Sequence, residues 1–415
     1  MCVCVCDTLR ARVSGRNKTS VGQTLRENDI NTMQPKQLNS RCLSPSRPMQ
    51  PNLPPEVIEA IIEEIDDREQ LAACSRICSA WTPFAQSKYF RHVRIRRMAP
   101  FLERIRESPH IALLPRSLSY TGDEDGDGTY LAQIAPLLVN VSTLYLENVD
   151  LESSESIRGI TEGFPSLQSL YLSVFALELH ILSSFFQSHP ALHTLSLDRG
   201  TITSTANEHQ ELLSLRHLRH LLVTYPGFIP PLIPVLVDRE TPLAQIERLT
   251  LSYCSSDESH VAAISTLLFG LRHSLHVLEI DSPPIGADSH TLDALVNRLP
   301  LEHLSALQEL AFPHITLDSH YFRWVNGILQ KVQKSGSVET LRFQMWNLHQ
   351  SQASISDWDT MKTILVAMPH LRLVSFELLG LTPASEARSI VQKGLEGIER
   401  KCTFELSAEC FLLNE

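Results

Sequence analysis

Residues 167–172 read LQSLYL, with an aliphatic residue first and leucines at the fourth and sixth positions. Successive side chains of a β-strand point to opposite faces, so Leu170 and Leu172 would share one face. The pattern apolar-x-x-apolar-x-apolar occurs nine times, at steps of 25 to 33 residues. The central residues of the nine copies are at positions 144, 170, 195, 221, 249, 278, 310, 341 and 374.

The stretches between the copies carry apolar residues at helical spacing, as in Asp257–Leu271 and Asp318–Lys334. One strand and one helix per repeat predict an α/β solenoid, because each unit can bury its apolar face only against its neighbours. We expect a curved parallel sheet of about ten to twelve strands inside and helices outside. The later helices should be longer, since the step grows after residue 250. Degenerate copies are expected at Val93/Ile95, Leu118/Tyr120 and Phe404/Leu406.

Residues 53–92 show a different pattern, that of three short helices. Residues 53–56, LPPE, open the first helix, with proline in the turn where its missing N–H costs nothing. Asp67 is placed to cap the second helix, with Gln70 as its capping-box partner. A Thr-Pro pair begins the third, which ends near Phe90. So small a core is marginal alone and would gain from a partner.

Residues 1–52 hold eight basic and three acidic residues, a charge of +5, so the remainder carries −16 of the total of −11. Ser, Asn, Gln, Thr and Pro are frequent and no apolar period is visible, which predicts a disordered tail. The sequence therefore divides into a disordered basic tail (1–52), a helical module (53–92) and a solenoid (93–415).

Composition excludes several classes of protein. The net charge of −11 argues against a general nucleic-acid binder, because phosphate binding draws on clustered Lys and Arg. No stretch approaches the roughly 20 apolar residues that span a bilayer. Nine cysteines are few for this length, and apart from Cys2, Cys4 and Cys6 they are scattered, which indicates reduced thiols and not a disulfide framework. We expect a cytoplasmic or nuclear protein with neither membrane nor nucleic acid as a partner.

No motif indicates catalysis, a cofactor or a metal. The sequence has no phosphate loop, no Gly-x-Ser-x-Gly elbow and no Gly-x-Gly-x-x-Gly. Residues 123–128 begin like a calcium loop, but Ile134 stands where a bidentate Glu is needed. The 17 histidines form no His-Glu-x-x-His pair, and most lie at polar positions, such as His189 before Pro190. We expect a protein that is not an enzyme and binds no cofactor.

Residues 53–90 resemble the F-box. Its pattern is Leu-Pro-x-Glu with aliphatic residues, an acidic turn and a second helix that ends in Cys-x-x-Trp. Two departures are the Ile65–Asp67 turn, where Leu-Asp-Pro is usual, and Ala80, where Arg often precedes Trp. The matching residues are Leu53, Pro54, Glu56, Val57, Ile58, Ile61, Ile65, Asp66, Leu71, Cys74, Cys78 and Trp81.

Residues 93–406 resemble leucine-rich repeats of an irregular kind. In that family the position three residues after the strand core is Asn or Cys, and here only Cys254 fits. The order of tail, F-box and irregular repeats looks like the large fungal families of F-box-like proteins with leucine-rich repeats. The non-matching residues at that position are Val149, Phe175, Gly200, Pro226, Pro283, Ile315, Trp346 and Leu379.

The resemblance implies a non-catalytic substrate-recognition subunit of an SCF-type cullin-RING E3 ubiquitin ligase. The F-box would dock the adaptor subunit, and through it a cullin, while the repeats bind the substrate. An aliphatic helix face beside a Trp is the kind of surface that helical partners bury. The alternative is a leucine-rich-repeat scaffold whose helical module is only a solenoid cap. The expected adaptor-binding residues are Leu53, Pro54, Val57, Ile58, Ile61, Ile62, Ile65, Leu71, Cys78 and Trp81.

The side chains that alternate with the core positions of each strand should form the concave surface. Across the nine copies they comprise six acids and two bases, a charge of −4. Such a surface would favour a basic protein segment, although solubilising charges on an exposed sheet would give the same pattern. The candidate substrate-binding residues are Tyr145, Glu147, Tyr171, Asp198, Arg248, Glu279, Asp281, Glu309, Arg342 and Glu377.

Overall fold

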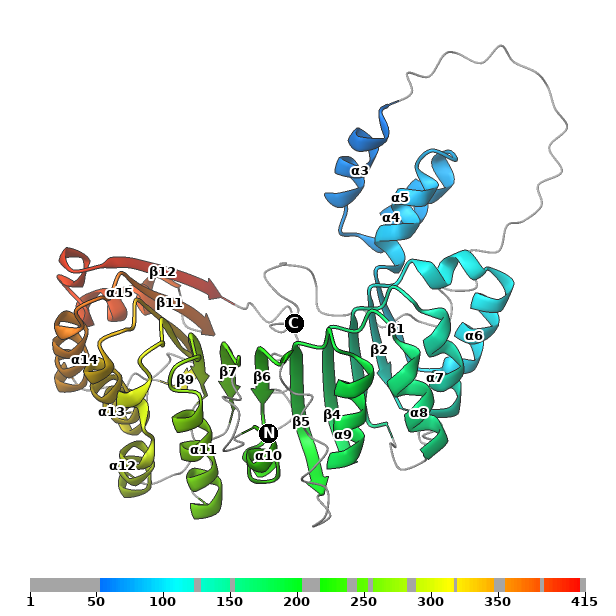
Figure 1. The fold of residues 1–415 in the computed structure, drawn as a ribbon. Helices are drawn as coiled ribbons and strands as arrows, with labels where there is room; N and C mark the ends of the chain where they lie inside the picture. The colour runs from blue at the N-terminus through cyan, green and yellow to red at the C-terminus, as the bar shows by residue number, and fades with distance from the viewer. Residues whose placement is uncertain are drawn as a thin grey trace, which may run out of the picture.

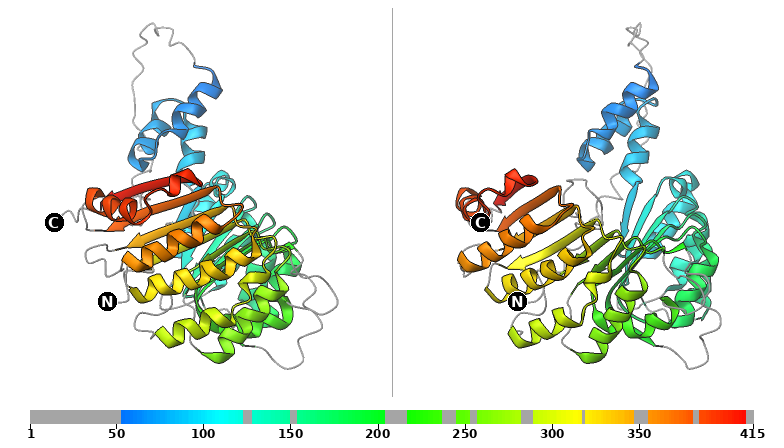
Figure 2. Two further views of the ribbon diagram at one scale, coloured as in Figure 1. Left: turned by 90° about the vertical axis from the view of Figure 1, so that its left-hand side faces the viewer. Right: turned by 60° about the vertical axis from the view of Figure 1, so that its left-hand side comes forward.

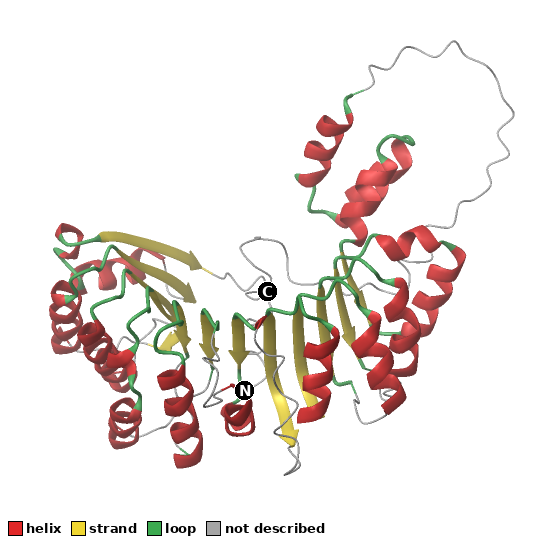
Figure 3. Cartoon of the chain, viewed as in Figure 1, coloured by secondary structure: helices red, strands yellow, loops and turns green. Residues whose placement is uncertain are grey.

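The fold was analysed in a computed structural model. Figure 1 shows a curved solenoid with a small helical module standing at its N-terminal end. Strands line the inside of the curve and helices cover the outside, as Figure 3 shows by colour. The structure describes residues 53–122, 128–149, 154–203, 217–236, 245–252, 257–281, 289–316, 319–346, 355–380 and 384–410.

One sheet of 12 strands runs through the described part of the solenoid, in the order β1 to β12. Each strand pairs in parallel with its sequence neighbours, so that Leu144 lies opposite both Leu118 and Leu170. The expected single parallel sheet, including the three degenerate copies, is confirmed. The strands are β1 (His92–Ile95), β2 (Ser117–Thr121), β3 (Thr143–Glu147), β4 (Ser169–Glu178), β5 (Thr194–Thr203), β6 (His220–Val223), β7 (Arg248–Leu251), β8 (Val277–Ile280), β9 (Glu309–Thr316), β10 (Thr340–Trp346), β11 (Leu373–Gly380) and β12 (Thr403–Cys410).

The helices form the outer layer, which Figure 2 shows from two further sides. Those before residue 250 have 7 to 10 residues and those after it 10 to 17, so the expected lengthening is confirmed. The α-helices are α6 (Met98–Glu107), α7 (Gly128–Ile134), α8 (Ser154–Gly163), α9 (Leu179–Ser188), α10 (Ile229–Leu236), α11 (Glu258–Gly270), α12 (Ser289–Arg298), α13 (Ser319–Ser335), α14 (Ile355–Ala367) and α15 (Ala384–Gly394). Short 3₁₀ turns are η1 (Pro109–Leu113), η2 (Ala135–Leu137), η5 (Pro226–Phe228), η6 (Leu301–His303) and η8 (Ile398–Arg400).

The solenoid core changes in composition along its length. Leucine fills the second core position of β3 to β5, and phenylalanine replaces it in β9 to β11. Phe312 stacks on Phe343 at 5.3 Å between ring centroids, and Phe343 stacks on Phe376 at 4.6 Å. Trp324 of α13 packs edge-on against Phe312 at 6.0 Å. Larger aromatic side chains thus accompany the longer helices.

Some strands continue beyond the core motif. β4 and β5 have 10 residues each and pair as far as Glu178 opposite Thr203. The positions at which leucine-rich repeats carry Asn or Cys are Phe175 and Gly200 on these strands. Neither residue has a side-chain amide that could hydrogen-bond to a turn. In a turn, such an amide would hydrogen-bond to backbone N–H and C=O groups. Here the continued strands pair these backbone groups with each other instead.

The helical module consists of α3 (Pro55–Glu63), α4 (Arg68–Ile77) and α5 (Thr82–Phe90). The Asp67 side chain accepts a hydrogen bond of 2.7 Å from the backbone N–H of Gln70, which confirms the expected cap of α4. The module has a hydrophobic cluster of its own, distinct from that of the solenoid. Its members are Ile58, Ile62, Leu71, Cys74 and Ala85, with Ile65, Trp81, Phe84 and Tyr89 packed against them.

Two glycines let α8 approach the preceding repeat closely. A Cβ on Gly159 would lie 2.3 Å from that of Ala132, and one on Gly163 would lie 2.3 Å from that of Ala135. Real Cβ atoms do not approach so closely, so the inter-repeat spacing here depends on glycine.

Gly159→Ala should therefore lower the free energy of unfolding by about 1–3 kcal/mol through overpacking. At a helix position with free space around the added Cβ, the same change would raise the free energy of unfolding by up to about 1 kcal/mol. Gly327→Ala is the matched control, because its nearest contact is a methyl of Val296 at 3.2 Å. Thermal unfolding measures both, and a higher Tm for Gly159→Ala would contradict the close packing.

His189 is buried, with 3% of its surface exposed, whereas the sequence suggested a polar position. Burial lowers the pKa of His189, and a contact with the backbone of Thr161 offsets part of that shift. The turn before β5 thus encloses a neutral imidazole beside Phe185, at 6.4 Å between ring centroids.

A histidine whose folded pKa is lowered binds fewer protons in the folded than in the unfolded state. Such a histidine does not lower the free energy of unfolding when the pH is above its pKa in the unfolded chain, about 6.5. As the pH falls below that value, it lowers the free energy of unfolding progressively. The Tm of the wild type should therefore fall from about pH 7 to about pH 5 more steeply than that of His189→Leu. Equal slopes would show that His189 is not responsible.

Candidate protein-binding surfaces

Helix α3 has two apolar faces. Ile58 and Ile62 are 3% and 1% exposed and belong to the module's own core. Val57 and Ile61 form a second row on the helix, and Leu53, two residues before α3 begins, continues it at the same spacing of four residues. Leu53, Val57 and Ile61 are 42%, 41% and 39% exposed. We call Leu53, Val57 and Ile61 the α3 stripe. A helix with one face packed and the other apolar and uncovered is suited to a second helical partner.

The other expected adaptor-binding residues do not share one surface. Leu71 is 3% exposed and lies within the core, as Ile58 and Ile62 do. Ile65 and Trp81 are partly buried against that core. Pro54 and Cys78 are exposed.

Sequence reasoning did not select Ile77, which is the most exposed large apolar residue of the module at 62%. It is the last residue of α4, and its exposure could have been read from its position off the Leu71–Cys74–Cys78 face. Cys78, one of the expected adaptor-binding residues, is exposed, because α4 ends before it and the chain becomes extended there.

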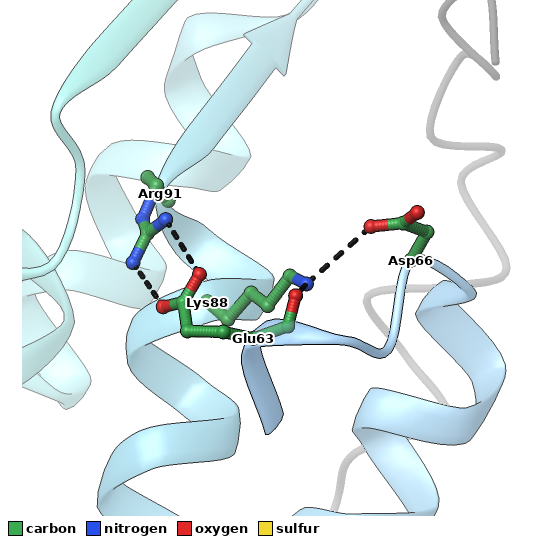
Figure 4. A network of polar contacts seen from close by, with 4 residues as sticks. All are labelled: Glu63, Asp66, Lys88 and Arg91. Carbon is green, nitrogen blue, oxygen red and sulfur yellow. Dashed lines mark hydrogen bonds and ion pairs between the residues drawn. The ribbon is translucent and has the colours of Figure 1, made fainter. Parts of the chain in front are cut away.

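A polar network, drawn in Figure 4, ties α3 to the end of α5. Arg91 and Glu63 form two parallel hydrogen bonds, one of them 3.1 Å between Nη1 and Oε2. Lys88 donates to the backbone carbonyl of Glu63, and its Nζ lies 3.4 Å from Oδ1 of Asp66. Paired bonds of the guanidinium with a carboxylate fix orientation as well as distance. The C-terminal end of α3 is thereby held against Arg91, which lies between α5 and β1.

Arg91 also belongs to the solenoid through its backbone. Its carbonyl accepts hydrogen bonds from the N–H groups of Arg116 and Ser117, at 2.9 and 3.0 Å. Arg68 of α4 adds a second tie, because its Nη2 donates to the backbone carbonyl of His92 at 3.0 Å. Burial, followed by the charges of Arg91 and Arg68, lowers the pKa of His92. The joint thus connects all three module helices with β1 and β2.

A pair of tyrosines stands on the concave surface. Tyr145 of β3 and Tyr171 of β4 are directly paired in register, and their rings stack at 4.3 Å with an interplanar angle of 14°. Burial raises the pKa of both hydroxyls. Both side chains remain partly exposed.

The charged candidates of the concave surface are linked across strands. Asp198 accepts hydrogen bonds from Ser173 on β4 and Thr224 beyond β6, and lies 3.2 Å from the Nε of Arg199. Other cross-strand contacts include Thr121–Glu147 (3.0 Å), Arg248–Glu279 (3.4 Å), Thr250–Glu279 (2.9 Å), Glu309–Arg342 (2.9 Å) and Gln344–Glu377 (2.7 Å).

Asp281 is the one buried member of the acidic candidates, with its side chain 4% exposed. Its Oδ2 lies 3.0 Å from the Nδ1 of His314, which the sequence did not single out. The register between β9 and β10 shifts after Phe312, at Pro313, and so displaces the residues that follow. Proline inside a predicted strand was the available signal for such an irregularity.

No metal site and no membrane span is present in the described ranges. They contain no group of three or more His, Cys, Asp or Glu placed to hold a metal ion. None of their helices is both long and apolar enough to cross a bilayer. Residues 123–127 of the calcium-like loop lie outside the described residues.

Comparison with known proteins gives no family. No family model and no curated protein matches the chain. Among solved structures, the leucine-rich repeat-containing protein LegL7 of Legionella pneumophila is similar at 14% identity and a TM-score of 0.45, over 77% of this chain and 91% of that one. Rad7, in the yeast Rad7 and Elc1 complex, is similar at 11% identity and a TM-score of 0.37, over 80% and 94%.

The mouse RP105/MD-1 complex gives 14% identity and a TM-score of 0.33, over 67% of this chain and 41% of that one. All three TM-scores lie below 0.5, so the architecture rests on this chain's own strand register.

Removal of the Glu63 carboxylate should loosen the joint while both parts stay folded. The side chains of Arg91 and Glu63 are 38% and 42% exposed, so Glu63→Ala should cost under about 1 kcal/mol of stability. Spin labels at Glu59 and Glu103, introduced as unnatural amino acids, would report a broader distance distribution.

Arg372→Ala is the control for the joint, because its 3.2 Å ion pair with Glu339 lies within the solenoid. It should leave the distance distribution unchanged. An equally narrow distribution in Glu63→Ala would show that the joint does not depend on this ion pair.

Proposed function

We propose that the chain is a non-catalytic substrate-recognition subunit of an SCF-type cullin-RING ubiquitin ligase. Its helical module binds the adaptor subunit, and the concave surface of the solenoid binds the protein substrate. The α3 stripe is the observation that carries this proposal. Its three aliphatic side chains are exposed, and two of them, Val57 and Ile61, lie on a helix whose other face is already packed.

The energetics of the stripe favour a partner. Full burial of one aliphatic side chain contributes roughly 1.5–3 kcal/mol, and covering the exposed portion of three contributes a fraction of that each. A module of three helices exposes four large apolar side chains, the α3 stripe and Ile77. Covering them would stabilise both the complex and a module that has a small core of its own.

The alternative, a scaffold in which the module only caps the solenoid, is less well supported. A cap would share its apolar side chains with the first repeat. Here the buried clusters of the module and the solenoid are separate. Phe90 at the end of α5 packs against the solenoid core, and the other contacts of the joint described above are polar. The module also stands away from the outer helices in Figure 1.

The joint supports a receptor role in a second way. A ligase subunit must hold its substrate at a definite position relative to the adaptor. The Glu63–Arg91 pair and the Arg91 carbonyl together hold the α3 stripe in a set orientation to β1 and β2. The concave surface therefore has a defined relation to the bound adaptor.

The test changes two residues of the α3 stripe and leaves the hydrophobic core of the helical module intact. Val57→Ser/Ile61→Ser should weaken binding of the purified adaptor subunit at least about tenfold, or roughly 1.4 kcal/mol, because both side chains lose their apolar contacts. Surface plasmon resonance measures the affinity, and circular dichroism checks that the helices remain. Unchanged affinity would sink the adaptor assignment.

Val366→Ser is the matched control. Val366 is 49% exposed but lies on α14, far along the solenoid, so its substitution should leave adaptor binding intact. Ile58→Ser is unsuitable as a probe, since it would unfold the module's own core.

A further inference from the structure

The concave surface combines a negative charge with an aromatic pair. From β3 to β11 its charged residues, listed among the substrate-binding candidates, are six acids and two bases. Arg199, beside Asp198, reduces the net charge from −4 to −3. Glu147 follows Tyr145 by two residues on β3, and Asp198 lies opposite Ser173, two residues after Tyr171. The carboxylates of Glu147 and Asp198 therefore lie next to the tyrosine pair, on the side toward the C-terminal ends of the strands.

The tyrosine stack suits a planar cation. Each ring covers one face of the other, and the register places a small residue beside each outer face, Ser119 next to Tyr145 and Ser196 next to Tyr171. A guanidinium can stack on an aromatic ring and pair with a carboxylate at the same time. Arginine is thus the side chain that fits this place best.

The chain itself contains an arginine-rich segment of opposite charge. Residues 8–26 hold five basic residues and no acidic one. Four of the five fall within residues 8–19, TLRARVSGRNKT. This segment lies outside the described residues.

The chain is long enough to bring this segment to the tyrosines. The 26 residues between 27 and 52 can span up to about 90 Å when extended. The tyrosines stand on the second and third strands after β1, about 10–15 Å across the sheet at the usual strand spacing. The module that follows residue 52 stands at the β1 end of the solenoid (Figure 1).

We propose that residues 8–26 bind the concave surface at Tyr145, Tyr171, Glu147 and Asp198 and compete there with a protein partner. A segment tethered to its own site has an effective concentration in the millimolar range, which no unattached basic peptide of ordinary abundance reaches. The competition rests on the proposed function, whereas the intramolecular contact itself does not.

The test adds the segment in trans to two full-length chains. The probe is a fluorescein-labelled synthetic peptide of residues 8–19, and fluorescence anisotropy at about 50 mM salt measures its binding, since screening weakens such contacts. One chain is wild type and the other carries Arg10→Ser, Arg12→Ser, Arg16→Ser and Lys18→Ser. The substituted chain should bind the peptide at least about tenfold more tightly, because its own segment no longer competes.

The site is located by further substitutions in the Arg/Lys→Ser chain. Glu147→Gln/Asp198→Asn should weaken peptide binding about tenfold, whereas Glu377→Gln, seven strands from β4, should not change it. Equal affinity of the two chains, no binding at low salt, or full binding after Glu147→Gln/Asp198→Asn would each overturn the proposal. Adaptor binding by the α3 stripe is measured separately, so a failure of either proposal is recognised independently.

Discussion

The solenoid depends on the stacking of equivalent core residues between neighbouring repeats. A single strand–helix unit cannot enclose its apolar row, so each row is buried only when the next repeat covers it. Leu118, Leu144, Leu170 and Leu195 lie directly opposite one another along the sheet and are at most 1% exposed. A slip of one residue in any strand would turn its leucines to the concave side. This one register therefore determines which side chains lie on each face of the sheet and which of them are neighbours.

The concave surface follows from the same register. Its side chains form aligned rows, which is why Tyr145 meets Tyr171 and why Arg248 meets Glu279 on the adjacent strand. Such pairs link neighbouring strands and moderate the charge of the acids. What remains is a weakly acidic sheet whose aromatic pair stands near the N-terminal end. A partner would meet fixed side chains there, because each is supported on both sides by paired strands.

The sequence predicted the parallel sheet and its register from periodicity, because the apolar pattern repeats nine times and its buried positions carry only apolar side chains. It could not separate the two faces of α3, since Val57 and Ile61 are as apolar as Ile58 and Ile62 and only the packing of α4 and α5 decides which are covered. The joint was also beyond prediction. Glu63 and Arg91 lie 28 residues apart, and nothing in their local pattern marks them as partners. The burial of His189 depends on tertiary packing in the same way.

The separate hydrophobic clusters of the module and the solenoid have a consequence for cooperativity. Elements that share a core unfold together, whereas elements joined by a few polar contacts and one aromatic side chain, here Phe90 against the solenoid core, unfold in separate steps. The chain should accordingly melt in more than one transition, with the small module at one free energy and the repeats at another. A chain whose repeats have opened could still display a folded α3 stripe. Under the proposed function, loss of the solenoid would remove the substrate-binding surface while the helical module still occupied the adaptor.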